Sequence, residues 1–372
     1  PAEDAMTIKV KAVVLTAKNE YSVQEIELDP PKANEVRIRM AATGLCMSDL
    51  SVINGKLPMP MPIVLGHEGA GVVEEVGPNV TNVKVGDHVI TSFIPMCGTC
   101  HFCQHQEPWL CTATDLFSGM QPDGTSRVKL NGKPIGAFAA LGNMAEQIVC
   151  PAMCVVPIKK KYSLSAAALV GCGVMTGAGA ALNTAKVRPG SSVAVFGCGG
   201  VGLSALQGAK IAGANPLIAV DLNDAKLEAA REFGATHTVN AGKDPVAQIM
   251  EITGGIGVDY AFEVIGIPSV VAQAYAATRR GGTCCLVGAP GATEEYKFSG
   301  LEMALSAKKV CGCIYGSTNA KVDFETLLGF YETGQLDLDR MQSRTYTIEE
   351  VHQGFDDMVA GRNIRGVILH GK

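Results

Sequence analysis

The sequence has no concentration of positive charge. Its 31 Lys and Arg residues are outnumbered by 36 Asp and Glu, so the 372 residues carry a formal net charge of −5. Proteins that bind nucleic acid usually present a dense basic face to the phosphates, and no such Lys/Arg-rich face is evident here. We therefore expect no nucleic-acid partner.

The sequence also has no evident internal repeat or low-complexity tract. Its 47% apolar and 18% charged residues, with 43 glycines, are typical of a folded globular enzyme rich in tight turns. Residues 1–11 lack the apolar core of a secretory signal. We therefore expect a cytoplasmic protein.

One uncharged stretch, residues 163–185, could be mistaken for a membrane span. It consists mostly of Ala and Gly, contains Asn183 and several hydroxyl residues, and is interrupted by Gly171-Cys172-Gly173. We interpret it as a buried junction between domains and expect no membrane partner.

The length of 372 residues exceeds the roughly 250–300 at which one hydrophobic core stops growing, so we expect two domains. From residue 192 to about 315, short β-branched runs alternate with amphipathic stretches, including helices at 224–233 and 245–252. This pattern predicts an α/β domain with a doubly wound parallel sheet. The predicted strands are 193–196, 217–221, 237–239, 258–262, 283–287 and 310–314.

The first 170 residues are predicted to be mostly β-strand and loop, with extended segments at 9–15, 35–43 and 70–76. The tail after residue 315 should rejoin this first domain. Its predicted elements are a helix at 324–333, an extended segment at 344–348, a helix at 349–360 and a strand at 366–369.

A glycine-rich turn, Gly197-Cys198-Gly199-Gly200-Val201-Gly202, directly follows the first predicted strand and opens an apolar helix. This G-x-G-x-x-G context is typical of a dinucleotide site, because the glycines let the backbone approach a pyrophosphate at the helix N-terminus. Asp221 ends the next strand, where its carboxylate can accept both adenosine ribose hydroxyls and repel a 2′-phosphate. Leu222-Asn223 offers no arginine for that phosphate, so we expect NAD rather than NADP. Lys226 could lie near the ribose or be a solvated helix lysine.

Thirteen cysteines, an odd number with no signal peptide, make a poor disulfide framework. The spacing Cys97-x2-Cys100-x2-Cys103-x7-Cys111 instead lets one loop surround a tetrahedral zinc ion without an open position, which predicts a structural Zn(II) site. The interleaved His101 and His105 are expected to lie outside that site.

A second candidate metal set is dispersed over Cys46, His67 and Cys172. Two thiolates and one imidazole would leave the fourth zinc position for water or an alcohol, as a catalytic zinc requires. Spacing does not establish that the three meet: the cysteines could be small buried apolar residues, and His67 a hydrogen-bonded loop histidine.

Several motifs together resemble the zinc-containing medium-chain alcohol dehydrogenases, along nearly the whole chain. They are Gly66-His67-Glu68-Gly69-Ala-Gly71, the four-cysteine loop, the glycine turn, Asp221 and Phe262-Glu-Val-Ile-Gly266. Met120-Gln-Pro-Asp-Gly-Thr-Ser-Arg127 resembles a loop of the longer, typically dimeric branch that includes thiol-dependent formaldehyde dehydrogenases. The resemblance implies a GroES-like β-rich catalytic domain (1–173 and 315–372) with both zinc sites, and a Rossmann NAD-binding domain (174–314).

The resemblance also implies roles for individual residues. Cys46, His67 and Cys172 would bind the catalytic zinc, with Glu68 an occasional ligand and Asp49 orienting the His67 ring. Ser48 would accept the alcohol proton. Thr176, Val264, Val287 and Ile314 match positions around the nicotinamide, and Arg365 matches one near the cofactor phosphate.

The sequence departs from the family at two positions. Ser51 replaces a histidine that usually completes the proton relay, so we expect a slower relay with altered pH dependence. Met47 replaces a cation that contacts the pyrophosphate in many relatives, which predicts looser cofactor binding.

The family's substrate pocket maps to apolar residues, with Ala140 where relatives carry a bulky aromatic; these positions are Leu57, Phe93, Leu116, Ala140 and Leu141. We therefore expect a roomy pocket that prefers benzylic or medium-chain primary alcohols or aldehydes to ethanol. The protein would be a homodimer or homotetramer. The alternatives are a thiol-adduct formaldehyde dehydrogenase, for which Arg127 and Lys129 are the nearest cations, and a nucleotide-binding structural protein without catalysis.

Overall fold

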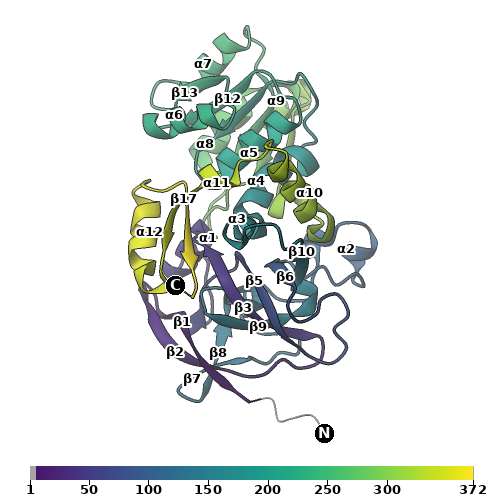
Figure 1. Ribbon diagram of the computed structural model, residues 1–372. Helices are drawn as coiled ribbons and strands as arrows, with labels where there is room; N and C mark the ends of the chain where they lie inside the picture. Colours follow the sequence, from purple (N-terminus) through teal and green to yellow (C-terminus); the bar gives the residue numbers. More distant parts are fainter. Residues whose placement is uncertain (1–5, 372) are drawn as a thin grey trace. The chain divides into compact units, whose positions relative to one another are not determined.

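The computed structural model describes residues 6–371 and forms two compact units. Among the described residues, the first unit contains 6–172, 319–329 and 338–371, and the second contains Gly173–Thr318 and Phe330–Asp337. Residues 1–5, within the segment expected to lack a secretory signal, lie outside the described residues. Figure 1 labels the elements along the chain.

The first unit contains a closed β-barrel in the order β1-β2-β7-β8-β4. Its long strand β1 is buried on both faces: Val10, Ala12 and Val14 pack into one core, whereas Val13 and Leu15 pack into another. The alternation of side chains along a strand accounts for this division. The barrel strands are β1 (Ile8–Ala17), β2 (Glu20–Leu28), β4 (Ile63–Val64), β7 (Val128–Leu130) and β8 (Lys133–Ala137).

A second sheet of the first unit has the order β10-β6-β5-β3-β18-β17, with β9 also paired to β3. Because β18 pairs with β3, the carboxyl-terminal strands, yellow in Figure 1, belong to the same sheet as amino-terminal ones. These strands are β3 (Glu35–Gly44), β5 (Gly69–Val76), β6 (His88–Thr91), β9 (Gln147–Pro151), β10 (Val155–Ile158), β17 (Gln342–Tyr346) and β18 (Arg365–Leu369).

The α-helices that the described residues form wholly or mainly in the first unit are α1 (Met47–Ile53), α2 (His101–Gln104), α3 (Leu164–Leu169), α10 (Ala320–Glu332), α11 (Leu338–Met341) and α12 (Val351–Val359). The last residues of α10 are grouped with the second unit.

The second unit is built on a six-stranded sheet in the order β13-β12-β11-β14-β15-β16, in which every adjacent pair is parallel. The order reverses between β11 and β14, the place where open α/β sheets bind ligands at their carboxyl ends. This sheet confirms the predicted doubly wound fold class. Its strands are β11 (Val193–Phe196), β12 (Leu217–Asp221), β13 (His237–Asn240), β14 (Val258–Glu263), β15 (Thr278–Leu286) and β16 (Lys309–Gly312).

The helices of the second unit are α4 (Met175–Gly179), α5 (Gly200–Ile211), α6 (Asp224–Glu232), α7 (Pro245–Ile252), α8 (Pro268–Ala277) and α9 (Gly300–Ser306). Helices α5 and α6 connect β11, β12 and β13 in turn. Helix α7 follows β13 and α8 follows β14. These are the crossover connections that a parallel sheet requires.

The structure differs from the sequence expectation at several boundaries. Strand β15 begins at Thr278 rather than at residue 283, because Thr278 already pairs with Val258 and the register then shifts. Residues 315–318 and 330–337, which the sequence placed in the first domain, group with the second unit. A hydrogen bond from the Asp337 N–H to the Gln207 side chain, at 2.7 Å, holds one of these segments there.

By length and composition alone, one helical run of the described residues could cross a membrane: Leu164–Thr184. Its most apolar window is 83% buried inside the protein. A buried core helix satisfies the same criteria, and this degree of burial agrees with the interpretation of the segment as protein interior.

Candidate active site

Three residues from separate parts of the first unit bring their side chains together. Cys46 immediately precedes α1, His67 lies between β4 and β5, and Cys172 lies in a π-helical turn after α3. Their metal-binding atoms all lie within 4.8 Å of one another, and all three side chains are buried. The structure thus assembles the dispersed set that the sequence left open.

The distances within this cluster fit a tetrahedral zinc ion. Zn–S bonds of about 2.3 Å and Zn–N bonds of about 2.0 Å put two sulfurs about 3.8 Å apart and sulfur and nitrogen about 3.5 Å apart. The Sγ atoms of Cys46 and Cys172 are separated by 4.0 Å, and Nε2 of His67 lies 3.3 Å from the Cys172 Sγ. A hydrogen bond from Cys172 lowers the pKa of Cys46 well below its usual value, so one thiolate is already favoured.

The Asp49 carboxylate fixes the His67 ring at Nδ1, whereas the Cys172 sulfur lies at Nε2. Oδ1 of Asp49 lies 3.3 Å from Nδ1 of His67 and accepts the Gly66 N–H at 2.9 Å. A proton on Nδ1 facing this carboxylate leaves the lone pair of Nε2 directed at the two sulfurs. Asp49 is fully buried, as the positioning role expected from the sequence requires.

Glu68 does not approach the cluster as a ligand in this structure. Its Oε1 accepts a hydrogen bond of 2.5 Å from Nη2 of Arg365, and both side chains are buried. Burial raises the pKa of Glu68 to about 7, although the Arg365 charge opposes that shift. A Cβ at Gly44 would lie only 2.2 Å from Glu68 Oε1, so glycine at this position makes room for the carboxylate. Sequence reasoning named Arg365 but missed this pair.

Aromatic side chains border the imidazole. The ring centroid of Phe93 lies 5.7 Å from that of His67, and the centroid of Phe138 lies 4.9 Å away, both edge-on. Phe93 was among the expected pocket residues, whereas Phe138 was missed. Its position two residues before Ala140 was the available signal.

The other expected pocket residues do not all lie in the same hydrophobic core. Leu57 and Leu116 are partly buried and pack against the core that contains Phe138. Ala140 is fully buried with a φ of 58°, and Leu141 belongs to the other core of the unit. Leu57 and Leu116 therefore share a core with Phe138, whereas Leu141 does not, and Phe93 packs against both cores.

Ser48 and Ser51 are partly exposed and lie three residues apart in α1, on one side of the helix. Met47, at the first position of α1, is 57% exposed. The serine expected to accept a proton is thus two residues from Cys46, with a second hydroxyl beside it.

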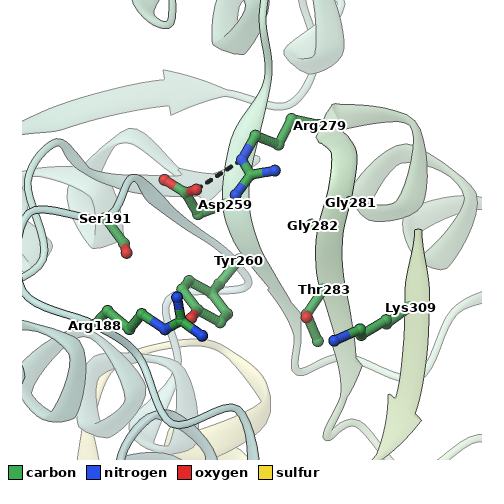
Figure 2. Close-up of a pocket in the computed structure, with 9 residues that line it drawn as sticks. All are labelled: Arg188, Ser191, Asp259, Tyr260, Arg279, Gly281, Gly282, Thr283 and Lys309. Carbon is green, nitrogen blue, oxygen red and sulfur yellow. Dashed lines mark hydrogen bonds and ion pairs between the residues drawn. The ribbon is translucent and has the colours of Figure 1, made fainter. Parts of the chain in front are cut away.

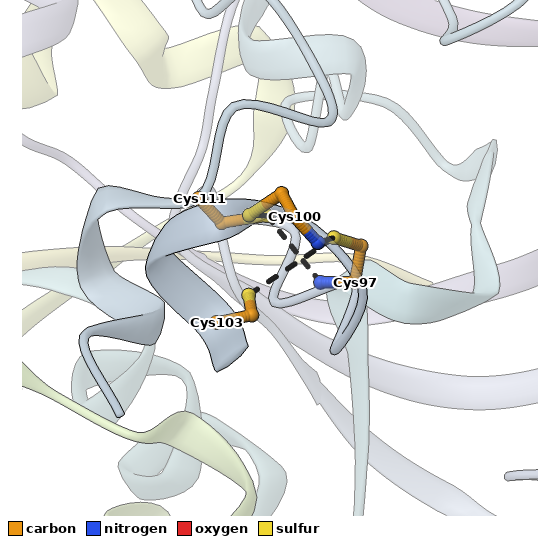
Figure 3. A group of neighbouring side chains, drawn as sticks. All are labelled: Cys97, Cys100, Cys103 and Cys111. Atoms are coloured by element: carbon orange, nitrogen blue, oxygen red, sulfur yellow. Dashed lines mark hydrogen bonds between the residues drawn. The ribbon is translucent and has the colours of Figure 1, made fainter. Parts of the chain in front are cut away.

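The four cysteines of the loop after β6 form a second cluster, shown in Figure 3. Sγ of Cys97 lies 4.0 Å from that of Cys103, and Cys100 and Cys111 are separated by 3.8 Å. These separations match the roughly 3.8 Å expected around tetrahedral zinc, and four thiols leave no open ligand position.

Backbone donors also face the cluster: the N–H groups of Thr99 and Cys100 point at Cys97 Sγ, at 3.4 and 3.3 Å. Burial would raise the pKa of Cys97, but donors from Thr99 and Cys100 lower it to about 6. His101 and His105 are exposed, with their ring centroids 4.1 Å apart, and do not join the cluster, as the sequence predicted.

In the second unit, the glycine turn follows β11 at the carboxyl end of the sheet. Gly197 has a φ of 102°, a conformation that favours glycine, and a Cβ at Gly202 would lie 1.8 Å from the Gly197 carbonyl oxygen. Helix α5 begins after Gly199 without a side-chain cap, and the space beside Gly199 is open. This turn fits a nucleotide phosphate, because the first N–H groups of the helix have no side-chain acceptor.

Asp221 lies at the end of β12, next to the same turn. Its carboxylate accepts the N–H of Cys198 at 2.8 Å and the N–H of Asn223 at 2.9 Å. The acid is therefore fixed beside the glycines, whereas Lys226 is a partly exposed residue of α6. Val201 lies in α5 and is partly exposed.

The residues matched to the nicotinamide positions occupy four segments of the second unit. Thr176 lies in α4, Val264 follows β14, Val287 follows β15, and Ile314 follows β16 with 42% exposure. The last three stand at the carboxyl ends of adjacent parallel strands. Val264 also contacts the turn, because a Cβ at Gly197 would lie 3.0 Å from its Cγ2.

Comparison with known proteins adds two family matches. Residues 32–160 match the model described as "Alcohol dehydrogenase GroES-like domain", and residues 200–333 match "Zinc-binding dehydrogenase". The matches cover the zinc-ligand candidates Cys46 and His67, the four-cysteine loop and the last three residues of the glycine turn.

Similar proteins extend over nearly the whole chain. An NDMA-dependent alcohol dehydrogenase of Amycolatopsis methanolica is 42% identical over 98% of this chain and 99% of its own length. A putative alcohol dehydrogenase D of Mycobacterium tuberculosis is 41% identical over 96% of this chain and 99% of its length.

Among solved structures, benzyl alcohol dehydrogenase from Acinetobacter calcoaceticus has a TM-score of 0.93 and 34% identity, covering 98% of this chain and 100% of its own. An alcohol dehydrogenase zinc-binding domain protein from Burkholderia ambifaria has a TM-score of 0.94 and 36% identity, covering 99% and 100%. A GroES-like domain, a parallel coenzyme-binding sheet and relatives of this similarity show that the chain belongs to the zinc-containing medium-chain alcohol dehydrogenase family.

Proposed function

We propose that this alcohol dehydrogenase transfers a hydride between a primary alcohol or aldehyde and NAD, with one catalytic and one structural zinc per chain. The observation that carries the proposal is the buried cluster of Cys46, His67 and Cys172, whose spacing suits one zinc with an open position. A zinc ion there would supply Lewis-acid chemistry by making an alcohol hydroxyl more acidic.

The chain's own residues would divide the remaining tasks. Asp49 holds His67 in the tautomer that a metal ligand needs. Ser48, partly exposed on α1, would accept the alcohol proton. Phe93 and Phe138 surround the imidazole with apolar surface and exclude water from the cluster.

The proposal of NAD rests on Asp221. A carboxylate fixed beside the glycine turn favours ribose hydroxyls and disfavours a 2′-phosphate, and the adjacent Leu222 supplies no cation.

The substitution Asp221→Asn tests this assignment. It replaces a charge-assisted hydrogen bond to the ribose, worth about 1.5–3 kcal/mol, with a neutral one worth about 1 kcal/mol, so the preference for NAD over NADP should fall about tenfold. The matched control is Asp224→Asn, an exposed acid three residues away that bonds to Asn240. Initial rates with NAD and NADP measure the preference, and an Asp221 variant indistinguishable from the Asp224 variant would contradict the assignment.

The proposed substrates are benzylic or medium-chain primary alcohols. Support comes from the apolar side chains near His67 and from a relative whose name is benzyl alcohol dehydrogenase. Steady-state rates across ethanol, hexanol and benzyl alcohol test the proposal, and the expected order of kcat/KM has ethanol last. Ethanol as the best substrate would overturn the substrate class while leaving the activity intact.

The electron acceptor needs its own test, because one similar protein is named for dependence on NDMA. The same alcohols should be assayed with NAD alone, NADP alone, and NDMA with and without added NAD. Turnover with NAD alone is the expected result. Turnover only when NDMA is present would contradict NAD as a freely exchanging acceptor.

Oxidation of a thiol adduct of formaldehyde is the second candidate function. The two cations considered for binding the thiol carrier, Arg127 and Lys129, already form ion pairs within the protein. Arg127 is buried and bonds to Glu35 at 2.6 and 2.8 Å, and Lys129 bonds to Asp29 at 2.8 Å. Neither side chain is left to receive the carboxylates of a thiol carrier. A formaldehyde assay with and without thiol should therefore show no thiol-dependent rate.

Metal analysis separates the proposal from a nucleotide-binding protein without catalysis. Two zincs per chain are expected, one for each of the two cysteine-containing clusters. One zinc per chain, lost on Cys103→Ser but retained in Cys46→Ser, would favour the structural protein.

A further inference from the structure

A cavity of about 210 Å³ opens in the second unit, and none of its lining residues belongs to either metal-binding cluster. Its walls come from the segment before β11 and from the first residues of β14, β15 and β16. It therefore lies at the amino edge of the parallel sheet, whereas the glycine turn lies at the carboxyl edge. Figure 2 shows its nine lining residues: Arg188, Ser191, Asp259, Tyr260, Arg279, Gly281, Gly282, Thr283 and Lys309.

The lining carries three cations and one carboxylate. Asp259 is already engaged, because Oδ1 accepts the Arg279 Nε at 2.7 Å and Oδ2 accepts the Ser192 N–H at 2.8 Å. Burial would raise the pKa of Asp259, but these donors outweigh it and hold the pKa below its usual value. The acid thus neutralises only Arg279.

The other two cations of the lining are Arg188 and Lys309. Among the described residues, neither the Arg188 guanidinium nor the Lys309 ammonium makes an ion pair or side-chain hydrogen bond, and the Thr283 hydroxyl makes none either. Figure 2 shows Arg188 and Lys309 extending into the view from opposite sides, with Thr283 beside Lys309. Two unpaired positive charges and a hydroxyl donor therefore border one hollow.

The backbone of β15 shapes this hollow. Between the pairs Val258–Thr278 and Tyr260–Thr283, the strand shifts register, and the extra residues include Gly281 with a φ of 72°. A Cβ at Gly282 would lie 2.8 Å from Thr278 Cγ2 and 2.9 Å from the Asp259 carbonyl oxygen, so this part of the wall has no room for a side chain. The Tyr260 ring forms an apolar wall near Arg188.

We propose that this cavity binds a small phosphomonoester or inorganic phosphate, as a ligand site separate from the nucleotide turn. The net charge of the lining, two positive, matches a phosphate dianion. Arg188 offers a planar fork, Lys309 a point charge and Thr283 a hydroxyl, which together suit an oxyanion approached from several sides. The volume exceeds that of one phosphate group, which leaves room for a small organic substituent against Tyr260.

The test is calorimetric titration of the zinc-loaded full chain with inorganic phosphate and with glycerol phosphate, in the presence of excess NAD. Binding of both is expected, and it should weaken as ionic strength rises. Arg188→Gln and Lys309→Gln should each raise the dissociation constant at least tenfold. Both positions are exposed, so folding should be preserved, and unchanged thermal unfolding would verify this.

Arg280→Gln is the matched control. It removes the same charge from β15, a strand that forms part of the cavity wall, but Arg280 does not line the cavity and instead bonds to the Leu305 carbonyl. Its dissociation constant should stay within twofold of the wild type. Absence of phosphate binding, or equal binding by all three variants, would overturn the site, and succinate binding as tightly as phosphate would overturn the phosphate assignment. These outcomes leave the proposed dehydrogenase activity untouched, because the substitutions lie at the other edge of the sheet.

Discussion

Arg127 is the centre of a buried ion-pair group whose removal should destabilise the first unit strongly. Its Nη2 bonds to Glu35 Oε1 at 2.6 Å, and its Nε bonds to Glu35 Oε2 at 2.8 Å. The two side chains are 1% and 6% exposed. Asp123, which is 43% exposed, supplies a further contact at 2.7 Å.

The substitution Arg127→Met leaves the Glu35 carboxylate buried with the Lys32 N–H, at 2.9 Å, as its remaining hydrogen-bond donor. Breaking a buried pair by removing one partner costs about 3–5 kcal/mol, because the other charge stays desolvated. We therefore expect Arg127→Met to lower the free energy of unfolding by about that amount. The double variant with Glu35→Met should recover most of the loss, since apolar replacement of a whole buried pair is often neutral.

Urea unfolding followed by tryptophan fluorescence measures the free energy of unfolding of the first unit, which contains Arg127. The chain has one tryptophan, Trp109, which lies in the first unit. Lys129→Met is the control, because Lys129 pairs with Asp29 at 2.8 Å but the side chains are 33% and 22% exposed, and such pairs contribute at most about 1 kcal/mol. A loss below 1 kcal/mol for Arg127→Met, or a double variant as unstable as the single one, would refute the reasoning.

Three further predictions concern single side chains. Ser51→His should change the pH–rate profile, because it adds an imidazole with a pKa near 6.5 one turn from Ser48; an unchanged profile would contradict a missing relay base. Cys103→Ser should remove one zinc per chain and alter the emission of Trp109 in the same loop, whereas Cys198→Ser, outside both clusters, should leave zinc content unchanged. Burial lowers the pKa of His370 from 6.5 to about 4, although the Glu349 charge opposes this shift. Between pH 6.5 and pH 4 the unfolded state therefore binds a proton at His370 that the folded state does not, and the free energy of unfolding should fall by about 2 kcal/mol from pH 7 to pH 5. The fall should be smaller in His370→Asn. Urea unfolding at several pH values measures it, and the same dependence on pH in both proteins would count against the prediction.

The features predictable from sequence were those whose residues are close in the chain. The cysteine loop and the glycine turn each occupy one short segment, so spacing and local context determined their geometry. The six parallel strands of the second unit were also predicted, because buried parallel strands are continuous apolar runs.

The barrel of the first unit was largely missed. Strands β4 and β7 have two and three residues, too few to show an alternating pattern. They are strands because β4 pairs with β1 and β7 pairs with β2, and each partner lies far away in the sequence. Such pairing depends on the closed barrel and not on local propensity.

The catalytic cluster likewise depends on tertiary structure. Cys46 follows β3 and His67 precedes β5, and the antiparallel pairing of these two strands brings their ends together. The sequence alone left Cys46, His67 and Cys172 with ordinary structural explanations, and the family resemblance was needed to connect them.

The Glu68–Arg365 pair shows why variants of a single residue near this cluster need a paired comparison. The two residues are 297 positions apart and both buried, so Arg365→Met would leave the Glu68 carboxylate without its cation beside Cys46. A loss of activity would then combine any lost phosphate contact with a charge left uncompensated in the cluster. Glu68→Gln keeps the guanidinium and removes only the carboxylate charge. Cofactor affinity that falls in Arg365→Met but not in Glu68→Gln would therefore isolate the phosphate contact, whereas equal losses in both would assign the effect to the pair.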